Sequence, residues 1–372
     1  MKNTDRNLEV LDRATVLNTS SDSGVQLNHH KLPEILRLEL TNTCNLACPH
    51  CRHHSADKRQ SDSYSPYYRT PIHMTEEQIE GIFDEIAPYK PSVTLNMANE
   101  PLIAETFPFA VRKVKECGLS GTFNSNGLTL DRELSQLLVD IQFDSINISI
   151  DAVTPGTLKL ARGITRLDTL IANIELLLEI RGDQPLPRVG VTFVETDYNY
   201  HEIPKFLDFW KERADVIRLT GYIKDSTPDV SEVPGWSRED LPDRVPCKQI
   251  FRDLCIRANG DVTTCVITAE SPDLPESIVG NVFRDGGLEA VWNGEKMNHL
   301  RTLHNSQKWD DISFCKTCDY WLETFDITEE DKDGFLIRKP SPYTTFYNVK
   351  SKMGNWDRDT LIERQSMGTI DT

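Results

Sequence analysis

The sequence predicts an α/β fold, a partial (β/α)6 TIM-like barrel followed by a small domain built from a β-hairpin and helices. Two observations predict the barrel: six short runs of β-forming residues recur along the chain, and an amphipathic helical pattern separates each consecutive pair. Such alternation implies parallel strands with right-handed crossovers, and six units fit an open barrel better than a closed eightfold one. A third observation, a stretch rich in Pro, Ser and acidic residues at 223–246, ends the pattern.

The six predicted strands read as buried runs bounded by turn-forming residues. They occupy residues 35–40, 92–97, 121–126, 144–150, 188–196 and 215–223. The helical patterns between them occupy residues 75–89, 109–118, 131–141, 167–180 and 202–213. The first of these opens with a capping box from Thr75 to Gln78, which predicts where that helix begins. In a barrel of this kind, side chains at the carboxyl ends of the strands meet at one rim.

Four segments follow from these patterns: an N-terminal extension at 1–34, the barrel at 35–235, the small domain at 236–325 and a C-terminal extension at 326–372. The small domain holds two β-like runs joined at Asn259–Gly260, a dipeptide favoured in tight hairpins. A helical pattern over residues 288–304 follows the hairpin. Neither extension shows a strong hydrophobic period, so we expect both to be partly mobile.

The composition is acidic, with 58 Asp and Glu against 41 Lys and Arg and a net charge of −17. This balance argues against nucleic acid or an anionic membrane as a bulk partner. No apolar run has the length of a signal peptide core or a membrane span, so we expect a cytoplasmic protein. In that reducing compartment, clustering among the nine cysteines favours metal ligation or catalysis over a disulfide framework.

Three cysteines, Cys44, Cys48 and Cys51, directly follow the first predicted strand with the spacing C-x3-C-x2-C. Three thiolates on a loop can wrap one face of a cubane iron–sulfur cluster and leave its fourth iron without a protein ligand. A structural zinc site is the alternative, and it would take its fourth ligand from His50, His53 or His54. The cysteine segment alone leaves both open.

This cysteine motif after the first strand of a partial barrel resembles the radical S-adenosylmethionine (radical SAM) superfamily, over about residues 35–320. The resemblance implies a [4Fe-4S] cluster whose open iron chelates the amino and carboxylate groups of S-adenosylmethionine. It implies further that one electron from the cluster cleaves the sulfonium and gives a 5′-deoxyadenosyl radical. An electron donor such as flavodoxin or ferredoxin would supply that electron.

The resemblance also suggests residues that would contact S-adenosylmethionine. His50 stands just before the third cysteine, where the family usually places an aromatic residue near the adenine. Glu100 and Pro101 match the family's Gly-Gly-Glu-Pro segment, which meets the amino group of the cofactor. In this sequence Ala98 and Asn99 stand where glycines are usual, so the backbone there must approach the cofactor differently.

Four further candidates follow the third and fourth strands. By resemblance, Asn126, Ser149 and Asp151 lie near the ribose and methionine parts of the cofactor, and Arg162 meets a carboxylate. Each has a structural alternative: Asn126–Gly127 can be only a turn, Asp151 only a helix N-cap, and Arg162 only a solvated surface side chain. Their shared location after consecutive strands favours the rim site.

A second set of cysteines lies in the small domain, at Cys247, Cys265, Cys315 and Cys318. Four thiols on a hairpin and a later loop can fully ligate a cluster, and on spacing alone a zinc ribbon is an equal candidate. The order of parts resembles the twitch domain of radical SAM enzymes, which holds one auxiliary [4Fe-4S] cluster, whereas the longer SPASM form holds two. Because no cysteine follows Cys318, we predict one auxiliary cluster and two [4Fe-4S] clusters overall.

Two cysteines remain outside these sets. Cys117 ends a predicted helix before Gly118 and reads as a half-buried structural thiol. Cys255 lies in the first hairpin strand, on the face opposite Leu254 and Ile256, and reads first as a small buried residue. Its functional alternatives are to give a hydrogen atom to a substrate radical, as a cysteine does in radical SAM epimerases, or to ligate the auxiliary cluster.

From the resemblance we expect an oxidoreductase that oxidises a hydroxyl carbon of a small sugar- or cyclitol-like substrate, with a base removing the hydroxyl proton and the auxiliary cluster accepting an electron. The alternatives are epimerisation of a sugar or a peptide, with Cys255 as hydrogen donor, and maturation of a ribosomal peptide. A short N-terminal segment counts against the last of these. The non-enzymatic alternative is a zinc-stabilised scaffold. Candidate bases near the strand ends are Glu195, Tyr222 and Lys224.

Overall fold

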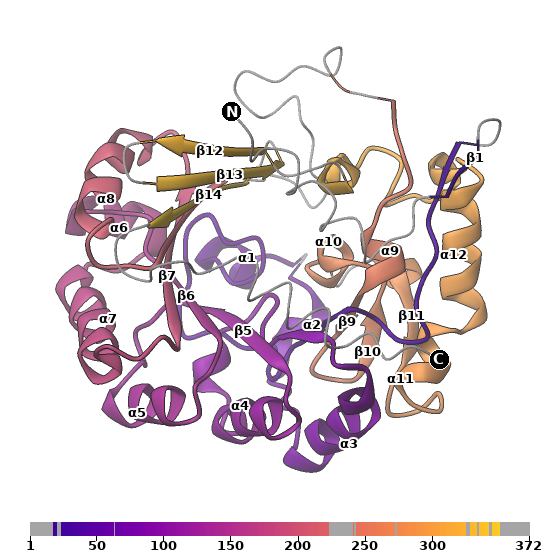
Figure 1. Ribbon diagram of the computed structural model, residues 1–372, viewed down its shortest axis with the longest axis horizontal. Helices are drawn as coiled ribbons and strands as arrows, with labels where there is room; N and C mark the ends of the chain where they lie inside the picture. The colour runs from indigo at the N-terminus through magenta and orange to yellow at the C-terminus, as the bar shows by residue number, and fades with distance from the viewer. Residues whose placement is uncertain are drawn as a thin grey trace, which may run out of the picture.

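The computed structural model describes residues 18–20, 24–62, 64–222, 241, 243–271, 274–324, 328–332, 335–341 and 344–349, with side chains described only between residues 27 and 322. Within this part of the chain, twelve strands form one sheet in the order β11-β10-β9-β3-β4-β5-β6-β7-β8-β14-β13-β12 (Figure 1). Lys224 and the predicted domain boundaries at 235 and 325 lie outside the described residues.

Six strands in the middle of this sheet form the open barrel. They are β3 (Ile35–Leu38), β4 (Ser92–Thr94), β5 (Ser120–Ser125), β6 (Ser145–Ser149), β7 (Arg188–Glu195) and β8 (Val216–Gly221). Every neighbouring pair among them is parallel. The six predicted strands are thus all present, and the predicted partial barrel is confirmed.

Helices cover the outer side of the barrel (Figure 1). They are α3 (Glu76–Ile86), α4 (Phe107–Glu116), α5 (Arg132–Asp140), α6 (Pro155–Arg162), α7 (Leu167–Arg181) and α8 (Ile203–Trp210). The capping box at Thr75 and Gln78 is formed, and α3 buries Ile79, Phe83 and Ile86 against the sheet. The spacing of apolar residues therefore fixes which face of each helix meets the strands.

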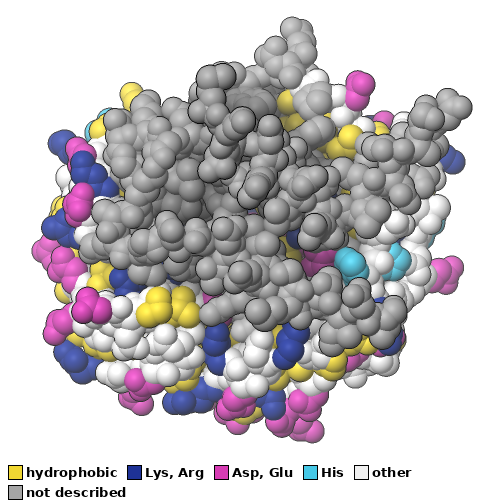
Figure 2. Space-filling model, viewed as in Figure 1, with side chains coloured by type: hydrophobic (Ala, Val, Ile, Leu, Met, Phe, Trp, Pro, Cys, Tyr) yellow, Lys and Arg dark blue, Asp and Glu magenta, His cyan; other side chains and the backbone are white. Residues whose placement is uncertain are grey.

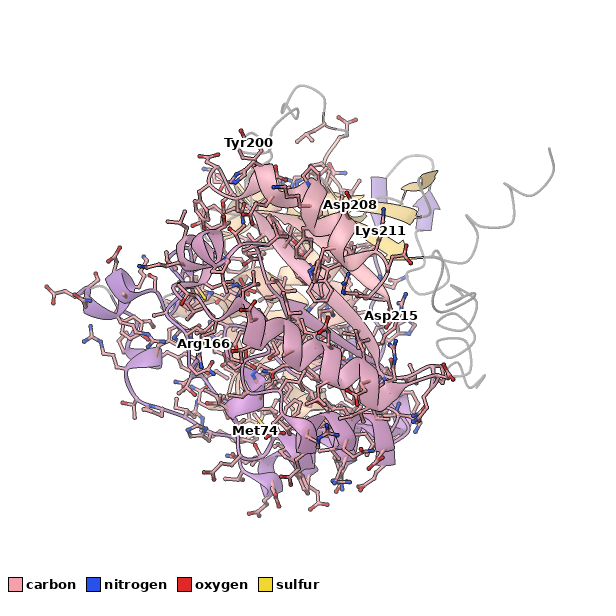
Figure 3. All side chains as sticks on the ribbon, turned by 90° about the vertical axis from the view of Figure 1, so that its left-hand side faces the viewer. Met74, Arg166, Tyr200, Asp208, Lys211 and Asp215 are labelled. Atoms are coloured by element: carbon pink, nitrogen blue, oxygen red, sulfur yellow. The ribbon has the colours of Figure 1, made fainter. Side chains whose placement is uncertain are left out.

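The helices on one flank show how the elements are joined. Figure 3 views α7 and α8 from outside, with Asp208 and Lys211 paired at 2.9 Å at the exposed end of α8. Inside, Arg181 at the end of α7 pairs with the buried carboxylate of Asp215, which also accepts the backbone N–H of Val189 at 2.7 Å. This buried pair ties α7 to the starts of β7 and β8, where removing one partner would leave an uncompensated charge.

The small domain extends the sheet at the edge of β3. Its strands are β9 (Asp253–Ile256), β10 (Asp261–Thr263) and β11 (Ile278–Asn281), and its helices are α9 (Gln249–Arg252), α10 (Val266–Ala269), α11 (Leu288–Trp292) and α12 (Glu295–Asn305). β9 and β10 form the predicted antiparallel hairpin, with Gly260 in the left-handed region at φ +84°. β9 also pairs in parallel with β3, so the hairpin continues the barrel sheet directly.

The opposite edge of the barrel is covered by strands that the sequence did not predict. β12 (Thr328–Lys332), β13 (Phe335–Ser341) and β14 (Thr344–Val349) form an antiparallel ribbon, and β14 pairs with β8. The described part of residues 326–372 thus forms strands although the sequence shows no strong hydrophobic period there. Charged residues and a proline interrupt the apolar alternation there, while the edge of β8 supplies a ladder that sequence periodicity does not reveal.

Short elements complete the described fold. β1 (Asn18–Ser20) and β2 (Gly24–Gln26) form a separate pair, and α1 (Ala56–Gln60) and α2 (Pro66–Arg69) follow the first cysteine group. Leu27 exchanges two 2.9 Å hydrogen bonds with the Asn305 side chain, so the N-terminal segment rests on α12. The 3₁₀ turns are Ala87–Tyr89, Pro101–Ile103, Tyr200–Glu202, Pro275–Ser277, Trp309–Asp311 and Tyr320–Thr324.

The apolar core lies between the sheet and its helices, where Phe83, Phe107, Phe123, Phe206 and Trp210 are almost fully buried. Around its outside, Figure 2 shows basic and acidic side chains interspersed along the rim that α3, α4 and α5 form in Figure 1. Among the described residues, no helix has the length and apolar character needed to cross a bilayer. The inside of the barrel is polar, and this is where the candidate site lies.

Candidate active site

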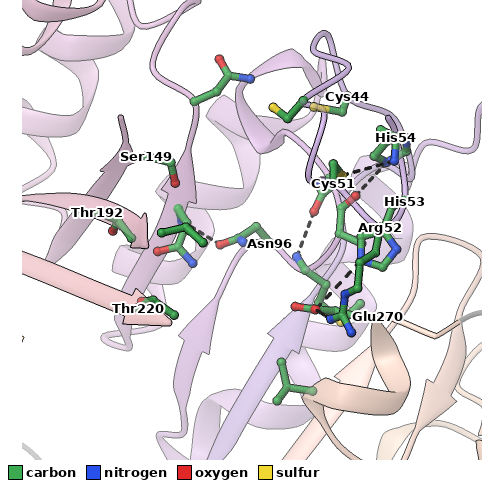
Figure 4. A pocket seen from close by; sticks show the side chains of 18 of the residues that line it. Cys44, Cys51, Arg52, His53, His54, Asn96, Ser149, Thr192, Thr220 and Glu270 are labelled. Carbon is green, nitrogen blue, oxygen red and sulfur yellow. Dashed lines mark hydrogen bonds and ion pairs between the residues drawn. The ribbon is translucent and has the colours of Figure 1, made fainter. Parts of the chain in front are cut away.

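A cavity of about 750 Å³ opens at the carboxyl ends of the barrel strands. One side of it is lined by the loop after β3, which carries the thiols of Cys44, Cys48 and Cys51. Another side is formed by the small domain, through residues such as Ile267 and Glu270. The cavity therefore lies between the three-cysteine loop and the small domain, as Figure 4 shows for Cys44, Cys51 and Glu270.

The three-cysteine loop is held by its own backbone and by neighbouring side chains. Arg59 on α1 donates to the carbonyls of Cys44 and Leu46 at 3.2 and 2.7 Å, and the Cys51 N–H donates to the Cys48 carbonyl at 2.9 Å. Burial raises the pKa of Cys44 to about 12 and that of Cys48 above its ordinary value. A thiol with a raised pKa stays protonated near neutral pH. These cysteines would therefore lose their protons only on ligating a cation, such as the iron of a cluster.

The neighbouring histidines have other partners. His50 Nδ1 lies 3.3 Å from the Tyr198 hydroxyl, His53 Nε2 lies 4.0 Å from Glu270, and His54 Nε2 lies 2.8 Å from the Ala98 carbonyl. Within the described residues, no three His, Cys, Asp or Glu side chains converge as a single metal ion requires. A cubane cluster spreads its ligands over several irons, so the three thiols facing the cavity fit an open cluster.

Glu100 and Asn126 are brought together beside this loop. Glu100 is buried, and its carboxylate accepts hydrogen bonds from the Ser125 hydroxyl and the Asn126 N–H, both at 2.7 Å. Burial raises the pKa of Glu100. The Asn126 side chain donates to Asn45 Oδ1 at 2.7 Å, so the segment after β5 is tied to the cysteine loop. Asn126 is therefore more than a turn residue.

Asp151, Arg162 and His50 form a second group. Arg162 Nη2 lies 2.7 Å and His50 Nε2 lies 3.9 Å from Asp151 Oδ2, while Asp151 Oδ1 accepts the Val194 N–H at 2.7 Å. Asp151 is fully buried behind the cavity wall, whereas Arg162 and His50 line the cavity. Burial lowers the pKa of His50, which favours the neutral ring.

The structure also tests the structural alternatives for two residues of this group, Asp151 as a helix N-cap and Arg162 as a solvated surface side chain. The N-cap of α6 is Thr154, so Asp151 is not the cap of that helix. The Arg162 side chain is 12% exposed and lies 4.0 Å from Cys48 Sγ, which contradicts a solvated surface role.

A row of hydroxyl and amide side chains forms the barrel side of the cavity. Ser149, Thr192 and Thr220 come from β6, β7 and β8, with Ser149 paired in register with Thr192 (Figure 4). Asn96 and Asn124 continue the row, and Asn96 Oδ1 accepts the Asn124 N–H at 2.7 Å. The Oγ1 atoms of Thr192 and Thr220 are buried and have no hydrogen-bond partner among the described residues. Such orphaned hydroxyls call for a water molecule or a polar ligand as hydrogen-bond partner.

The segment 97–100, which lacks the usual glycines, is fixed by three hydrogen bonds. Asn99 Oδ1 accepts the Met97 N–H at 2.9 Å, the Glu100 N–H donates to the Thr43 carbonyl at 3.0 Å, and His54 Nε2 meets the Ala98 carbonyl. Burial lowers the pKa of His54 to about 4, so its neutral ring has one N–H, which the Ala98 carbonyl accepts. The His54 backbone N–H points to Cys51 Sγ at 3.2 Å.

The small-domain wall carries residues that the sequence did not single out. Arg52, directly after Cys51, pairs with Glu270 Oε2 at 2.7 Å, and His53 approaches the same oxygen (Figure 4). Although burial alone would raise it, hydrogen bonding from His53 and the charge of Arg52 hold the pKa of Glu270 below its ordinary value. No sequence signal marks Glu270, because its place in the cavity depends on how the hairpin docks.

The four thiols of the small domain lie close together. Burial, then the neighbouring thiols of Cys318, Cys265 and Cys315, raise the pKa of Cys247 well above its ordinary value. The Cys318 N–H donates to the Cys315 carbonyl at 3.2 Å. Four thiols close to one another can together ligate one cluster, which would then have no open position.

The other predicted residues are placed as follows. Cys255 is fully buried and packs with Met97 and Ala269, and it does not line the cavity. Cys117 is partly buried at the end of α4. Of the candidate bases, Tyr222 lines the cavity, whereas Glu195 at the end of β7 is exposed and lies outside the lining.

Comparison with known families agrees with this geometry. The model of the radical SAM superfamily matches residues 38–210, and that of an iron–sulfur cluster-binding domain, SPASM, matches residues 247–319. The chain belongs to the radical SAM superfamily. Its SPASM or twitch part coincides with the hairpin and the four-cysteine group, and the two domains imply [4Fe-4S] clusters and binding of S-adenosylmethionine.

Relatives of this radical SAM protein have varied names. It is 23% identical to a tungsten-containing aldehyde ferredoxin oxidoreductase cofactor-modifying protein of Pyrococcus furiosus, over 78% of this chain and 90% of that one. It is 26% identical to a probable GTP 3',8-cyclase of Methanothermobacter marburgensis, over 54% of this chain, and it spans only 62% of that relative.

Solved structures show the same fold. SuiB of Streptococcus suis bound to S-adenosylmethionine matches with a TM-score of 0.57 and 15% identity, over 79% of this chain and 73% of that one. The protein anSMEcpe with bound AdoMet matches with a TM-score of 0.55 and 15% identity, over 77% and 86%. At these identities the likeness extends to the radical SAM and SPASM architecture alone.

Proposed function

We propose that this radical SAM enzyme oxidises a hydroxyl carbon of a small sugar- or cyclitol-like substrate. The observation that carries the proposal is the polar barrel side of the cavity, where hydroxyls and amides from successive strands face one space. Thr192 and Thr220 each bring a buried hydroxyl without a partner among the described residues. A substrate with several hydroxyl groups would satisfy them, because each hydroxyl both donates and accepts hydrogen bonds.

The open cysteine group would hold the first [4Fe-4S] cluster through Cys44, Cys48 and Cys51. The candidate residues for S-adenosylmethionine beside it are His50, Glu100, Asn126, Ser149 and Arg162, with Asp151 orienting Arg162 and His50 from behind. Flavodoxin or ferredoxin is the expected electron donor. The closed group of Cys247, Cys265, Cys315 and Cys318 would hold one auxiliary [4Fe-4S] cluster.

When bound, these groups supply the radical that removes a hydrogen atom from the substrate carbon and the acceptor that takes the second electron. The chain itself contributes binding and proton transfer. Tyr222 and Glu270 both line the cavity and are candidates to receive the substrate hydroxyl proton. Arg52 holds Glu270 in place, and its charge favours the carboxylate form that can accept a proton.

The test is product identification under anaerobic conditions. Reconstituted enzyme, reduced with dithionite, would be incubated with S-adenosylmethionine and a fractionated extract, in which small metabolites and peptides are kept apart. We expect 5′-deoxyadenosine to form together with a small hydroxylated compound that has lost two hydrogens. A peptide product would contradict the proposal, as would a product that keeps all its hydrogens in H2O and gains one deuterium at carbon in D2O.

The last outcome would indicate epimerisation, and Cys255→Ala separates it from oxidation. An epimerase that uses Cys255 would accumulate unquenched or oxidised product in this variant. An oxidase would keep turning over, since Cys255 is buried away from the cavity. Loss of the auxiliary cluster in the variant would instead show that Cys255 is a ligand and that the four-thiol assignment is wrong.

A further inference from the structure

Cations gather around the cavity although the chain is acidic overall. The chain carries a net charge of −17, yet six Lys and Arg residues line the cavity against two carboxylates. The cations are Arg37, Arg52, Arg162, Arg218, Lys248 and Arg252, and the carboxylates are Glu100 and Glu270. Three more acids, Glu34, Asp151 and Asp253, pair with these cations from outside this lining. The positive side of each pair therefore faces the cavity.

Two of the arginines form ion pairs between the neighbouring strands β3 and β9, one from each strand to the other. Arg37 on β3 pairs with Asp253 on β9 at 3.2 Å, and Arg252, just before β9, pairs with Glu34, just before β3, at 2.8 Å. The strands are parallel here, with Ile35 opposite Asp253. Both guanidinium groups are thus held where the small domain joins the barrel.

Each of these arginines contacts its carboxylate through one nitrogen only. Arg37 uses Nη2, and its buried Nε has no hydrogen-bond partner among the described residues. Arg252 uses Nε, which leaves its two terminal nitrogens as donors. A guanidinium has five N–H donors in a planar fork, so a carboxylate on one side leaves the other side able to bind a second anion.

A third cation, Lys248, lines the same part of the cavity. It precedes α9 and lines both the central cavity and a smaller one of about 140 Å³ beside Cys247, as do Arg37 and Arg252. Arg218 lines the central cavity from β8, the last barrel strand, in register with Thr192 of the polar row. The polar row and the end of the cavity that Arg37, Lys248 and Arg252 line therefore face one continuous space.

We propose that this end of the cavity binds an anionic group of the substrate, a phosphate ester or a carboxylate, through Arg37, Lys248 and Arg252. The proposal rests on the proposed function, because it assigns the charged part of the same hydroxylated substrate. The hydroxyl groups would meet Thr192, Thr220 and the neighbouring amides, and the anion would set which carbon lies nearest the open cluster site.

Anion binding can be measured without knowing the substrate. The anaerobic holoenzyme, loaded with S-adenosylmethionine, would be titrated by calorimetry at low ionic strength with inorganic phosphate, with acetate and with uncharged myo-inositol. We expect one saturable anion site. Tighter binding of phosphate would assign a phosphate ester, and tighter binding of acetate would assign a carboxylate. No saturable binding of either anion would overturn the proposal.

The variants remove cations from the proposed anion site. Arg252→Gln and Lys248→Gln should each weaken anion binding about tenfold or more, because each removes a charge-assisted donor. The matched control is Arg284→Gln, which removes an exposed arginine that pairs with Asp261 in the same small domain, away from the cavity. Iron content would show whether each variant keeps its clusters. Equal weakening in the Arg284 variant would overturn the assignment.

The cations could instead serve only to neutralise the thiolates around Cys247. In that case Arg252→Gln would shift the midpoint potential of the auxiliary cluster and leave anion binding unchanged, which would overturn the proposal. The proposed oxidation is tested separately. An oxidised neutral product with no anion binding would overturn the anionic substrate class and leave the proposed oxidation standing. Anion binding with an epimerised or cross-linked product would overturn the proposed oxidation and leave the anion site standing.

Discussion

At the scale of single residues, the candidate site depends on a few buried side chains that each hold two segments. His54 is the clearest case, since its backbone N–H meets Cys51 Sγ at 3.2 Å and its ring meets the Ala98 carbonyl at 2.8 Å. It thereby links the cysteine loop to the segment that carries Ala98 and Asn99 in place of glycines. Sequence alone left His54 unassigned, because histidines near cysteines first suggest metal ligation.

His54→Ala should weaken binding of S-adenosylmethionine by about tenfold, because loss of this hydrogen bond releases the Ala98 segment. His54→Gln, whose side-chain amide can donate to the same carbonyl, should keep most of the affinity. The measurement is equilibrium binding to the reconstituted enzyme, with the change in the cluster EPR spectrum on cofactor addition as a second readout. His73→Ala, at an exposed position, is the control. Equal affinities for the Ala and Gln variants would argue against the hydrogen bond.

Glu39 gives the fold a pH dependence. Its carboxyl is buried, accepts a hydrogen bond from the Tyr67 hydroxyl and lies 3.3 Å from the Ala258 N–H, and burial raises its pKa to about 7. A raised pKa favours the protonated form in the folded state, so the stabilisation is present at low pH and is lost as the pH rises toward 7.

Between pH 5.5 and 8, the free energy of unfolding of the natural chain should fall by about 2 kcal/mol relative to that of Glu39→Gln, because the amide does not titrate. Urea unfolding at several pH values measures this difference. Parallel pH profiles for the two proteins would show that Glu39 does not titrate in this range.

At the scale of elements, the predicted strands, helices and hairpin came from hydrophobic period, the capping box and the Asn259–Gly260 turn, all of which are local. What sequence could not give was which edges pair. The parallel pairing of β9 with β3 and the ladder between β14 and β8 join segments far apart in the chain. Arg252 and Glu270 reach the cavity only because β9 pairs with β3, and the same pairing brings Asp253 to Arg37. These residues could therefore not be assigned to the site from sequence.

The hairpin turn offers a test at this scale. Gly260 lies at φ +84°, and a Cβ there would sit 2.2 Å from Phe283 Cδ2. Gly260→Ala should destabilise the small domain by roughly 2 kcal/mol or more and reduce the iron held by its four thiols. Gly156→Ala is the control, because that glycine is helical and has open space around it. Thermal unfolding and iron content measure both, and equal behaviour of the two variants would contradict the assigned turn.

At the scale of the whole molecule, one sheet joins the barrel to the small domain, and the cavity lies between the three-cysteine loop and that domain. The two cysteine groups could be proposed as ligand sets because their spacing can be read directly from the sequence. The position of the cavity at the carboxyl ends of the strands could be predicted because parallel strands end at the same edge of the barrel. The charge of the cavity was not predicted, since the chain is acidic overall and its cations gather only when the strands pair. The central claim is that three thiols form an open set and four form a closed one.

Iron and acid-labile sulfide content after anaerobic reconstitution tests this claim most directly. The natural chain should hold about eight irons and eight sulfides, and a variant with Cys44, Cys48 and Cys51 changed to Ala should hold about four of each. Changing Cys265 and Cys315 to Ala should also leave about four, and those four should still show an EPR change when S-adenosylmethionine is added. A colourless protein that holds zinc and no sulfide would contradict the account.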